Sequence, residues 1–352
     1  MKAAVWYGQK DVRVENVPEP PAPGEGQVKI KVEWCGICGS DLHEYLAGPI
    51  LIPGTEPHPL TGVKAPVILG HEFVGEIVEV GAGVDKVKVG DRVAPDACQV
   101  DWTCYHCKRN QYNLCENLAF TGLAAQGAFA EYVNVPAYTL YKLPDSVSNE
   151  EGALIEPMSV GIHAVRQAPV IEGDSVVVLG AGTIGLVTLQ AARAAGASKV
   201  FVIEMAKARK EYAMEMGATA VFDPKEVDVL AKVKEATGGL GADVVIECIG
   251  NAKTGPLAVK LARKGGKVVL VGVFEQESTI NFLEVVANEK HIIGSLAYNG
   301  EFSTAINLLG DGRLKAEPLI TGKIKIDDIV EKGFEELVNR KAENIKIIVS
   351  PR

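Results

Sequence analysis

The stretch from residue 176 to residue 195 constrains the fold of this chain most. Val176–Leu179 is a continuous apolar run, as in a strand that is buried on both faces of a sheet. A Gly-Ala-Gly-Thr-Ile-Gly turn follows at residues 180–185, and a helix-like stretch rich in Ala, Leu and Gln then continues to Ala195. Such a turn lets backbone N–H groups and a helix N-terminus face a pyrophosphate. The pattern therefore predicts a dinucleotide site on a parallel sheet.

The next strand of this region ends in an acid. Val200–Ile203 leads into Glu204, which stands 204 − 185 = 19 residues after Gly185. An acid there accepts hydrogen bonds from the adenosine ribose and repels a 2′-phosphate, so NAD(H) is favoured over NADP(H), although Lys207 and Arg209 nearby soften this discrimination. The predicted cofactor-binding residues are Gly180, Gly182, Thr183, Ile184, Gly185, Glu204 and Arg209.

Strand and helix patterns alternate from about residue 148. Ser148 and Glu151 have capping-box spacing and predict a helix start. Further strand-like runs occur at 244–246, 268–271 and 291–293, and a helix is expected from Lys207 to Met216. Alternating strands and helices predict an α/β fold with a doubly wound parallel sheet.

Residues 1–150 have a different pattern, which predicts strands. Val28, Ile30, Val32 and Trp34 alternate with charged residues, as in a half-buried strand. Residues 73–80 and the segment that starts at 90 predict further strands, each next to glycine. Mixed patterns return from about residue 297 and end in an apolar run at 345–349.

Composition and charge exclude several classes of protein. The 352 residues carry a net charge of −9, which argues against nucleic acid or an anionic membrane as a partner. No stretch approaches the roughly 20 apolar residues of a membrane helix, and the N-terminus predicts no signal peptide. The seven cysteines are clustered rather than arranged as a disulfide framework, so metal binding in the cytoplasm is expected.

Two segments carry residues that ligate zinc. Cys38 follows the alternating strand, and His71 and Glu72 stand together further along the chain. A catalytic zinc needs three protein ligands and one open position, and Glu156, before Pro157 near the change of pattern, is a candidate from a third segment. Cys35 and Cys38 could instead form a zinc knuckle or redox pair, but no second pair lies nearby to complete it.

A second cluster consists of Cys104, Cys107 and Cys115. Three cysteines this close together predict a structural zinc lobe, which needs a fourth ligand. Asp101 and Cys98, three and six residues before Cys104, are the two candidates. Reduced cysteines without metal are the alternative.

Taken together, these motifs resemble those of the zinc-dependent medium-chain alcohol dehydrogenases along essentially the whole chain. They are Cys38-Gly39-Ser40-Asp41, Gly70-His71-Glu72, Gly90-Asp91-Arg92-Val93, the cysteine lobe, Glu156-Pro157 and the glycine loop. Within that family the segments 34–45 and 48–67 are most similar to those of the (R,R)-2,3-butanediol dehydrogenases. The lobe departs from the family pattern, since Asp101 stands where the first of four cysteines is expected.

The resemblance implies a GroES-like β-barrel catalytic domain, residues 1–157 and 297–352, interrupted by a Rossmann NAD-binding domain, residues 158–296. It implies a catalytic zinc on Cys38, His71 and Glu156, with Glu72 as an exchanging acid. Ser40 and His43 fall at the positions of the proton relay. Asp101, Cys104, Cys107 and Cys115 correspond to the structural zinc site.

The implied reaction is the NAD(H)-dependent interconversion of a vicinal diol and its hydroxyketone, with 2,3-butanediol and acetoin as the expected pair. A sorbitol or other polyol dehydrogenase and an L-threonine dehydrogenase are alternatives within the family. A more remote one is a protein that binds nucleotide or zinc without turnover. A homodimer or homotetramer is expected.

Overall fold

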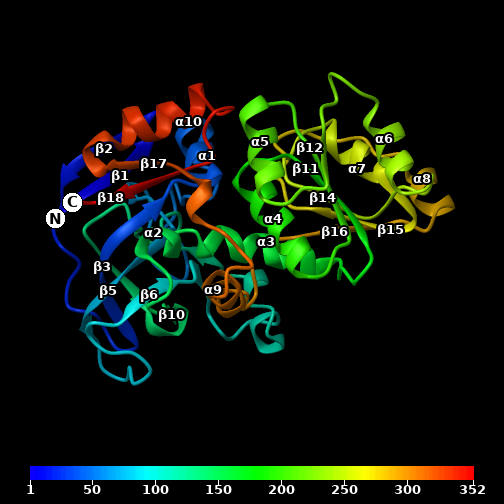
Figure 1. Cartoon of the computed structure of the whole chain (residues 1–352). Helices are drawn as coiled ribbons and strands as arrows, with labels where there is room; N and C mark the ends of the chain where they lie inside the picture. The colour runs from blue at the N-terminus through cyan, green and yellow to red at the C-terminus, as the bar shows by residue number, and fades with distance from the viewer. The chain divides into compact units, whose positions relative to one another are not determined.

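The chain divides after Glu156 and again after Lys315 in the computed structural model, which describes residues 1–352. The first unit is Met1–Glu156 with Ala316–Arg352, and the second unit is Pro157–Lys315 (Figure 1). The second boundary lies after Lys315 rather than at the expected residue 297. Helix α9 (Phe302–Gly310) belongs to the second unit because Glu301, directly before it, bonds to a residue of that unit, Arg166.

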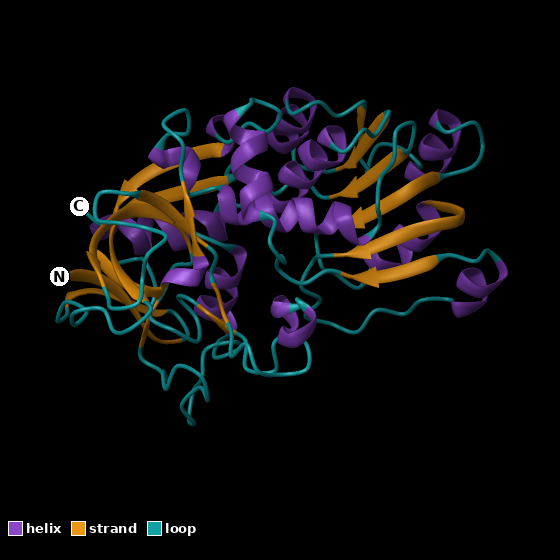
Figure 2. Cartoon of the chain, turned by 90° about the horizontal axis from the view of Figure 1, so that it is seen from below, coloured by secondary structure: helices purple, strands orange, loops and turns teal.

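A six-stranded parallel sheet forms the centre of the second unit, and its arrows point the same way in Figure 2. Its strand order is β13-β12-β11-β14-β15-β16. In chain order this is 3-2-1-4-5-6, the Rossmann arrangement, so the predicted doubly wound sheet is confirmed. The strands are β11 (Ser175–Leu179), β12 (Lys199–Ile203), β13 (Ala220–Phe222), β14 (Ala242–Glu247), β15 (Ala262–Leu270) and β16 (His291–Gly294).

Helices on both faces of this sheet explain the uninterrupted apolar run in β11. Val177 and Leu179 belong to a core cluster with residues of α6 (Val229–Ala236) and α7 (Thr254–Leu261). Val178 points the other way, toward the start of α4 (Thr183–Ala194). The remaining helices are α3 (Ile155–Gln167), α5 (Lys207–Glu215) and α8 (Phe282–Ala287).

The first unit is mostly antiparallel β-structure. Its main sheet has the order β10-β6-β5-β3-β18-β17, and β9 also pairs with β3. The C-terminal strand β18 lies antiparallel to β3, so the two ends of the chain build one sheet. These strands are β3 (Gln27–Gly36), β5 (Glu72–Val80), β6 (Arg92–Pro95), β9 (Tyr132–Pro136), β10 (Leu140–Lys142), β17 (Ile320–Lys325) and β18 (Lys346–Ser350).

Two smaller sheets, three short α-helices, several 3-10 helices and a π-helix (Ile329–Glu335) complete the first unit. The sheets have the orders β2-β1-β4 and β7-β8. Their strands are β1 (Lys2–Gly8), β2 (Asp11–Asn16), β4 (Val67–Ile68), β7 (Cys98–Gln99) and β8 (Ala119–Phe120). The helices are α1 (Gly39–Ala47), α2 (Asn149–Gly152) and α10 (Glu336–Asn339).

Local predictions agree with this structure, with one difference in burial. Ser148 accepts a hydrogen bond from the Glu151 N–H and forms the predicted capping box of α2. Strand β3, however, is more buried than its alternation suggests: Lys29 is buried and pairs with Glu79 at 2.5 Å. Strand β3 is also an inner strand, which pairs with β5 along one edge and with β9 along the other. None of the helices has the length and the apolar character that a membrane span requires.

Candidate metal and cofactor sites

Cys38, His71 and Glu72 come together in the first unit. Their ligating atoms all lie within 4.8 Å of one another. Cys38 is the N-cap residue of α1, just after β3, while Glu72 begins β5 and His71 directly precedes it. Gly70 takes a φ of +98°, and a Cβ on it would meet Cys35 Sγ at 2.8 Å. Glycine at this position therefore lets the chain turn closely enough to place His71 beside α1.

Asp41 and Ser40 flank the imidazole of His71. The buried Asp41 accepts the Cys38 N–H at 2.9 Å, and its other oxygen lies 3.6 Å from Nδ1 of His71. A carboxylate on one imidazole nitrogen orients the other toward a metal. Ser40 Oγ lies 3.1 Å from that other nitrogen, Nε2. Asp41 is thus a site residue that the sequence analysis named only as part of a motif.

Lys346 is a second residue that the sequence analysis missed. It lies on β18, is buried, and donates to both carboxylate oxygens of Glu72 at 2.8 and 2.5 Å. Burial is the largest single influence on the pKa of Lys346 and lowers it, but the negative charges of Glu72, Cys38 and Glu156 and the hydrogen bonds to Glu72 together hold this pKa above its ordinary value. A Cβ on Gly36 would meet Glu72 Oε2 at 2.2 Å, so glycine makes room for this pair.

The chemistry of this cluster fits a zinc ion. Burial raises the pKa of the Cys38 thiol well above its ordinary value, and the negative charges of Glu72 and Glu156 raise it further. Without a metal, Cys38 is therefore held as the neutral thiol. A bound divalent cation favours the thiolate instead, because it stabilises the negative charge on sulfur. Glu156 is buried at the start of α3 and does not belong to the group within 4.8 Å, so its role as third ligand stays a prediction.

His43 stands on α1, three residues after Ser40. Residues with this spacing are neighbours on one face of a helix. His43 is half-buried, so it can connect the site with solvent. The structure thus places both predicted relay residues on one short helix.

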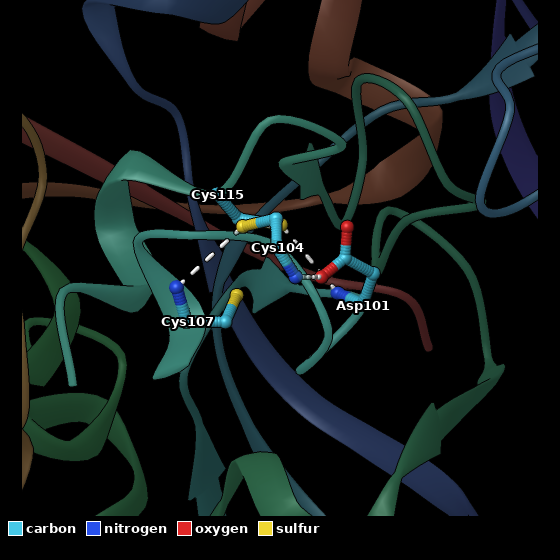
Figure 3. A group of neighbouring side chains, drawn as sticks. All are labelled: Asp101, Cys104, Cys107 and Cys115. Carbon is cyan, nitrogen blue, oxygen red and sulfur yellow. Dashed lines mark hydrogen bonds between the residues drawn. The ribbon is translucent and has the colours of Figure 1, made fainter. Parts of the chain in front are cut away.

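The second cluster consists of Asp101 and three cysteines (Figure 3). The Asp101 carboxylate and the sulfur atoms of Cys104, Cys107 and Cys115 lie within 4.8 Å of one another. Cys98 lies buried on β7 and is not part of this group. The geometry therefore favours Asp101 over Cys98 as the fourth ligand.

The environment of this cluster supports anionic ligands. Asp101 accepts the Cys104 and Thr103 N–H groups at 3.0 and 2.7 Å and the Asn117 amide at 2.8 Å, which lowers its pKa. The Cys107 N–H, 3.5 Å from Cys104 Sγ, lowers the pKa of that thiol. Burial instead raises the pKa of Cys107 to about 12. A zinc ion would overcome this cost by stabilising the thiolates.

The glycine loop has the geometry of a phosphate cradle. Gly180 takes a φ of +95°, and a Cβ on Gly185 would meet the Gly180 carbonyl oxygen at 2.0 Å. Gly182 is the N-cap of α4, and the nearest atom to a Cβ there is Arg209 Nη1 at 3.5 Å. Thr183 and Ile184 form the first turn of that helix. The loop therefore leaves its outer side open at a helix N-terminus, where a pyrophosphate fits.

Glu204 lies beside this loop. Its carboxylate accepts the Ala181 N–H at 2.9 Å and the Met205 and Ala206 N–H groups at 2.7 and 2.8 Å. Arg209 is half-buried, and burial lowers its pKa although Glu204 opposes this shift. The acid and the base predicted from the sequence thus lie together next to the glycine loop.

Comparison with known proteins places these sites in a family. The profile described as alcohol dehydrogenase GroES-like domain matches residues 24–145, and the one described as zinc-binding dehydrogenase matches residues 183–311. The chain is 44% identical to the (R,R)-butanediol dehydrogenase of Bacillus subtilis over 100% of both proteins. It is 39% identical to that of Neisseria gonorrhoeae over 100% of this chain and 99% of the relative.

A solved structure supports the same relationship. The crystal structure of 2R,3R-butanediol dehydrogenase from Bacillus subtilis matches with a TM-score of 0.94 and 43% identity. The match covers 100% of this chain and 99% of that chain.

Proposed function

Because the chain belongs to the family of zinc-binding alcohol dehydrogenases, we propose that it interconverts a vicinal diol and its hydroxyketone with NAD(H). The proposed pair is 2,3-butanediol, the diol in the names of the relatives above, and acetoin, the hydroxyketone that its oxidation gives. The observation that carries the chemistry is the placement of Ser40 Oγ, 3.1 Å from His71 Nε2, within the cluster of potential zinc ligands. A proton acceptor at a metal site is what alcohol oxidation requires.

Each group of the site has a separate role in this proposed reaction. Zinc, when bound by Cys38 and His71 with Glu156 or Glu72, supplies Lewis acidity, and NAD accepts the hydride. Ser40 takes the proton that leaves the substrate hydroxyl, and His43 passes it toward solvent. The Asp41 carboxylate faces His71 Nδ1 at 3.6 Å, longer than a hydrogen bond, so its negative charge favours this orientation of the ring.

A substrate panel tests the proposed reaction. NADH oxidation is measured with acetoin, diacetyl, fructose and 2-amino-3-ketobutyrate, and the products are separated on a chiral column. Acetoin should give the highest kcat/KM and a butanediol with an R carbinol. A preference for fructose would make the enzyme a polyol dehydrogenase, and a preference for 2-amino-3-ketobutyrate would make it a threonine dehydrogenase.

The preference for NAD(H) rests on Glu204. Its carboxylate beside the glycine loop repels a 2′-phosphate. Kinetics with both cofactors should give a higher kcat/KM with NADH than with NADPH. Glu204→Ser should reduce the ratio of these two kcat/KM values. Equal or better kcat/KM with NADPH in the unmodified enzyme would refute this preference.

The proposed assembly is a homodimer or homotetramer. Strand β16 is an edge strand of its sheet, and the preceding α8 exposes Phe282, Leu283 and Val286 by 71%, 72% and 74%. Light scattering at micromolar concentration should show an oligomer that Val286→Glu weakens. Leu240→Glu, a control at a position exposed by 69% elsewhere in this unit, should leave it intact. A monomer would contradict the proposal.

A further inference from the structure

Glu247 is a buried acid whose contacts are made to the backbone. It is the last residue of β14 and has no solvent exposure. Its carboxylate accepts the Ile249 N–H at 2.9 Å and the Gly250 N–H at 2.9 and 3.1 Å. A buried carboxylate of this kind fixes the loop that donates to it, because these N–H groups would otherwise be unsatisfied.

The backbone of the same residue holds a second loop. The carbonyl oxygen of Glu247 accepts the Val271 N–H at 2.9 Å and the Gly272 N–H at 3.0 Å, both just after β15. The two loops also touch directly. A Cβ on Gly272 would meet the Gly250 nitrogen at 2.2 Å and Glu247 Oε2 at 2.6 Å. Glu247 therefore joins the loops after two neighbouring strands.

These loops lie at the place where the strand order reverses. Strand β14 is next to β11, and the Cys248 N–H donates to the Leu179 carbonyl at 3.0 Å. A dinucleotide binds across the carboxyl ends of the strands at this reversal. The glycine loop and Glu204 lie on the β11–β12 side and take the pyrophosphate and the adenosine. The nicotinamide half must then extend over the loops after β14 and β15.

We propose that Glu247 is a positioning residue for the nicotinamide half of the cofactor site. It acts through two loops. Its carboxylate accepts N–H groups of the 249–250 loop, and its carbonyl oxygen accepts N–H groups of the 271–273 loop. Exposed apolar side chains, Ile249 and Val273, are presented by these loops. The inference rests on the cofactor assigned under the proposed function. Glu247 is not part of the glycine motif and is not the acid expected to bind the ribose, so neither of these sequence signals identifies it.

Binding of two ligands to the full-length protein tests this role. NADH carries the nicotinamide, whereas ADP-ribose has the adenosine, the pyrophosphate and the second ribose only. Glu247→Gln should weaken NADH by about tenfold, about 1.4 kcal/mol, while the Kd of ADP-ribose changes less than about twofold. The reason is that the amide NH₂ of Gln would face an N–H donor and loosen the loops.

Two further variants make the result decisive. Gly272→Ala should give the same selective loss, because its Cβ enters the contact between the loops. Asp243→Asn is the control: this acid stands at the other end of β14 and accepts the Ser175 N–H at 2.8 Å. It should change neither affinity. Thermal unfolding of each variant checks that it is folded.

The outcomes separate the inference from the function. Unchanged NADH affinity in Glu247→Gln, or an equal loss for both ligands, would overturn the positioning role. If Glu247→Gln does not fold, Gly272→Ala decides by the same two affinities. Failure of the unmodified protein to bind either ligand would instead contradict the proposed cofactor.

Discussion

Ser40 is the residue on which the proposed proton transfer depends most directly. Ser40→Ala should lower kcat for acetoin reduction by roughly 10²–10⁴-fold, the usual contribution of a positioned proton-transfer group. His43→Gln should cost less, since water can replace an outer relay residue. Stopped-flow NADH binding is the control and should be unchanged in both variants. Full activity of Ser40→Ala would assign the proton to another group.

The buried pair of Lys346 and Glu72 gives a second prediction. Lys346→Met leaves the Glu72 carboxylate buried without its cation, which should lower the free energy of unfolding by about 3–5 kcal/mol. The double variant Lys346→Met with Glu72→Gln should recover part of this loss. Urea unfolding at neutral pH measures both. A loss below about 1 kcal/mol in the single variant would mean that a bound metal or water compensates Glu72.

At the residue scale, the sequence identified ligand types but not the partners that support them. Cys38, His71 and Glu72 were recognised because these side chains ligate zinc, and the structure brings them together. Lys346 gave no such signal, because a lone lysine is usually a surface residue and this one lies 274 positions from Glu72. Only the pairing of β18 with β3 brings it to the site.

Among the elements, the cysteine lobe offers the sharpest prediction. Metal analysis of protein purified without added zinc should give about two zinc ions per chain. Asp101→Ala should lower this count and the melting temperature while sparing acetoin reduction, because it removes one of four ligands. Cys98→Ala is the control and should leave the count unchanged. If Cys98→Ala lowers the zinc count and Asp101→Ala does not, Cys98 is the fourth ligand. If the unmodified protein holds one zinc ion per chain and Cys104→Ala does not change its melting temperature, the lobe binds no metal.

Elements with strong local signals were predictable, and those defined by tertiary contacts were not. The apolar run of β11 and the capping box of α2 have clear patterns, and both are confirmed. Strand β13, only three residues long and not fully buried, carries no such pattern and was missed. Helix α9 lies in the second unit, and Thr304 on it accepts a hydrogen bond from Arg166, 138 residues earlier in the chain, a contact that no local pattern indicates.

At the scale of the whole molecule, the chain builds its metal cluster from both ends of the first unit. Strands β3 and β5 carry Cys38 and His71 into place, and β18 returns after the whole second unit to supply Lys346. The division into two units therefore follows from the sequence pattern only in outline. The second boundary, after Lys315, depends on the tertiary contacts of the residues that follow β16.

Removal and return of zinc show whether the cluster of Cys38 and His71 works as a metal site in the reaction. The rate of acetoin-dependent NADH oxidation is measured before chelation, after it, and after zinc is restored, with metal content determined at each step. We expect the rate to be lost with the metal and recovered when zinc returns, because Cys38 and His71 would otherwise hold no Lewis acid for the substrate oxygen. A rate that persists in protein free of zinc would mean that zinc takes no part in the reaction.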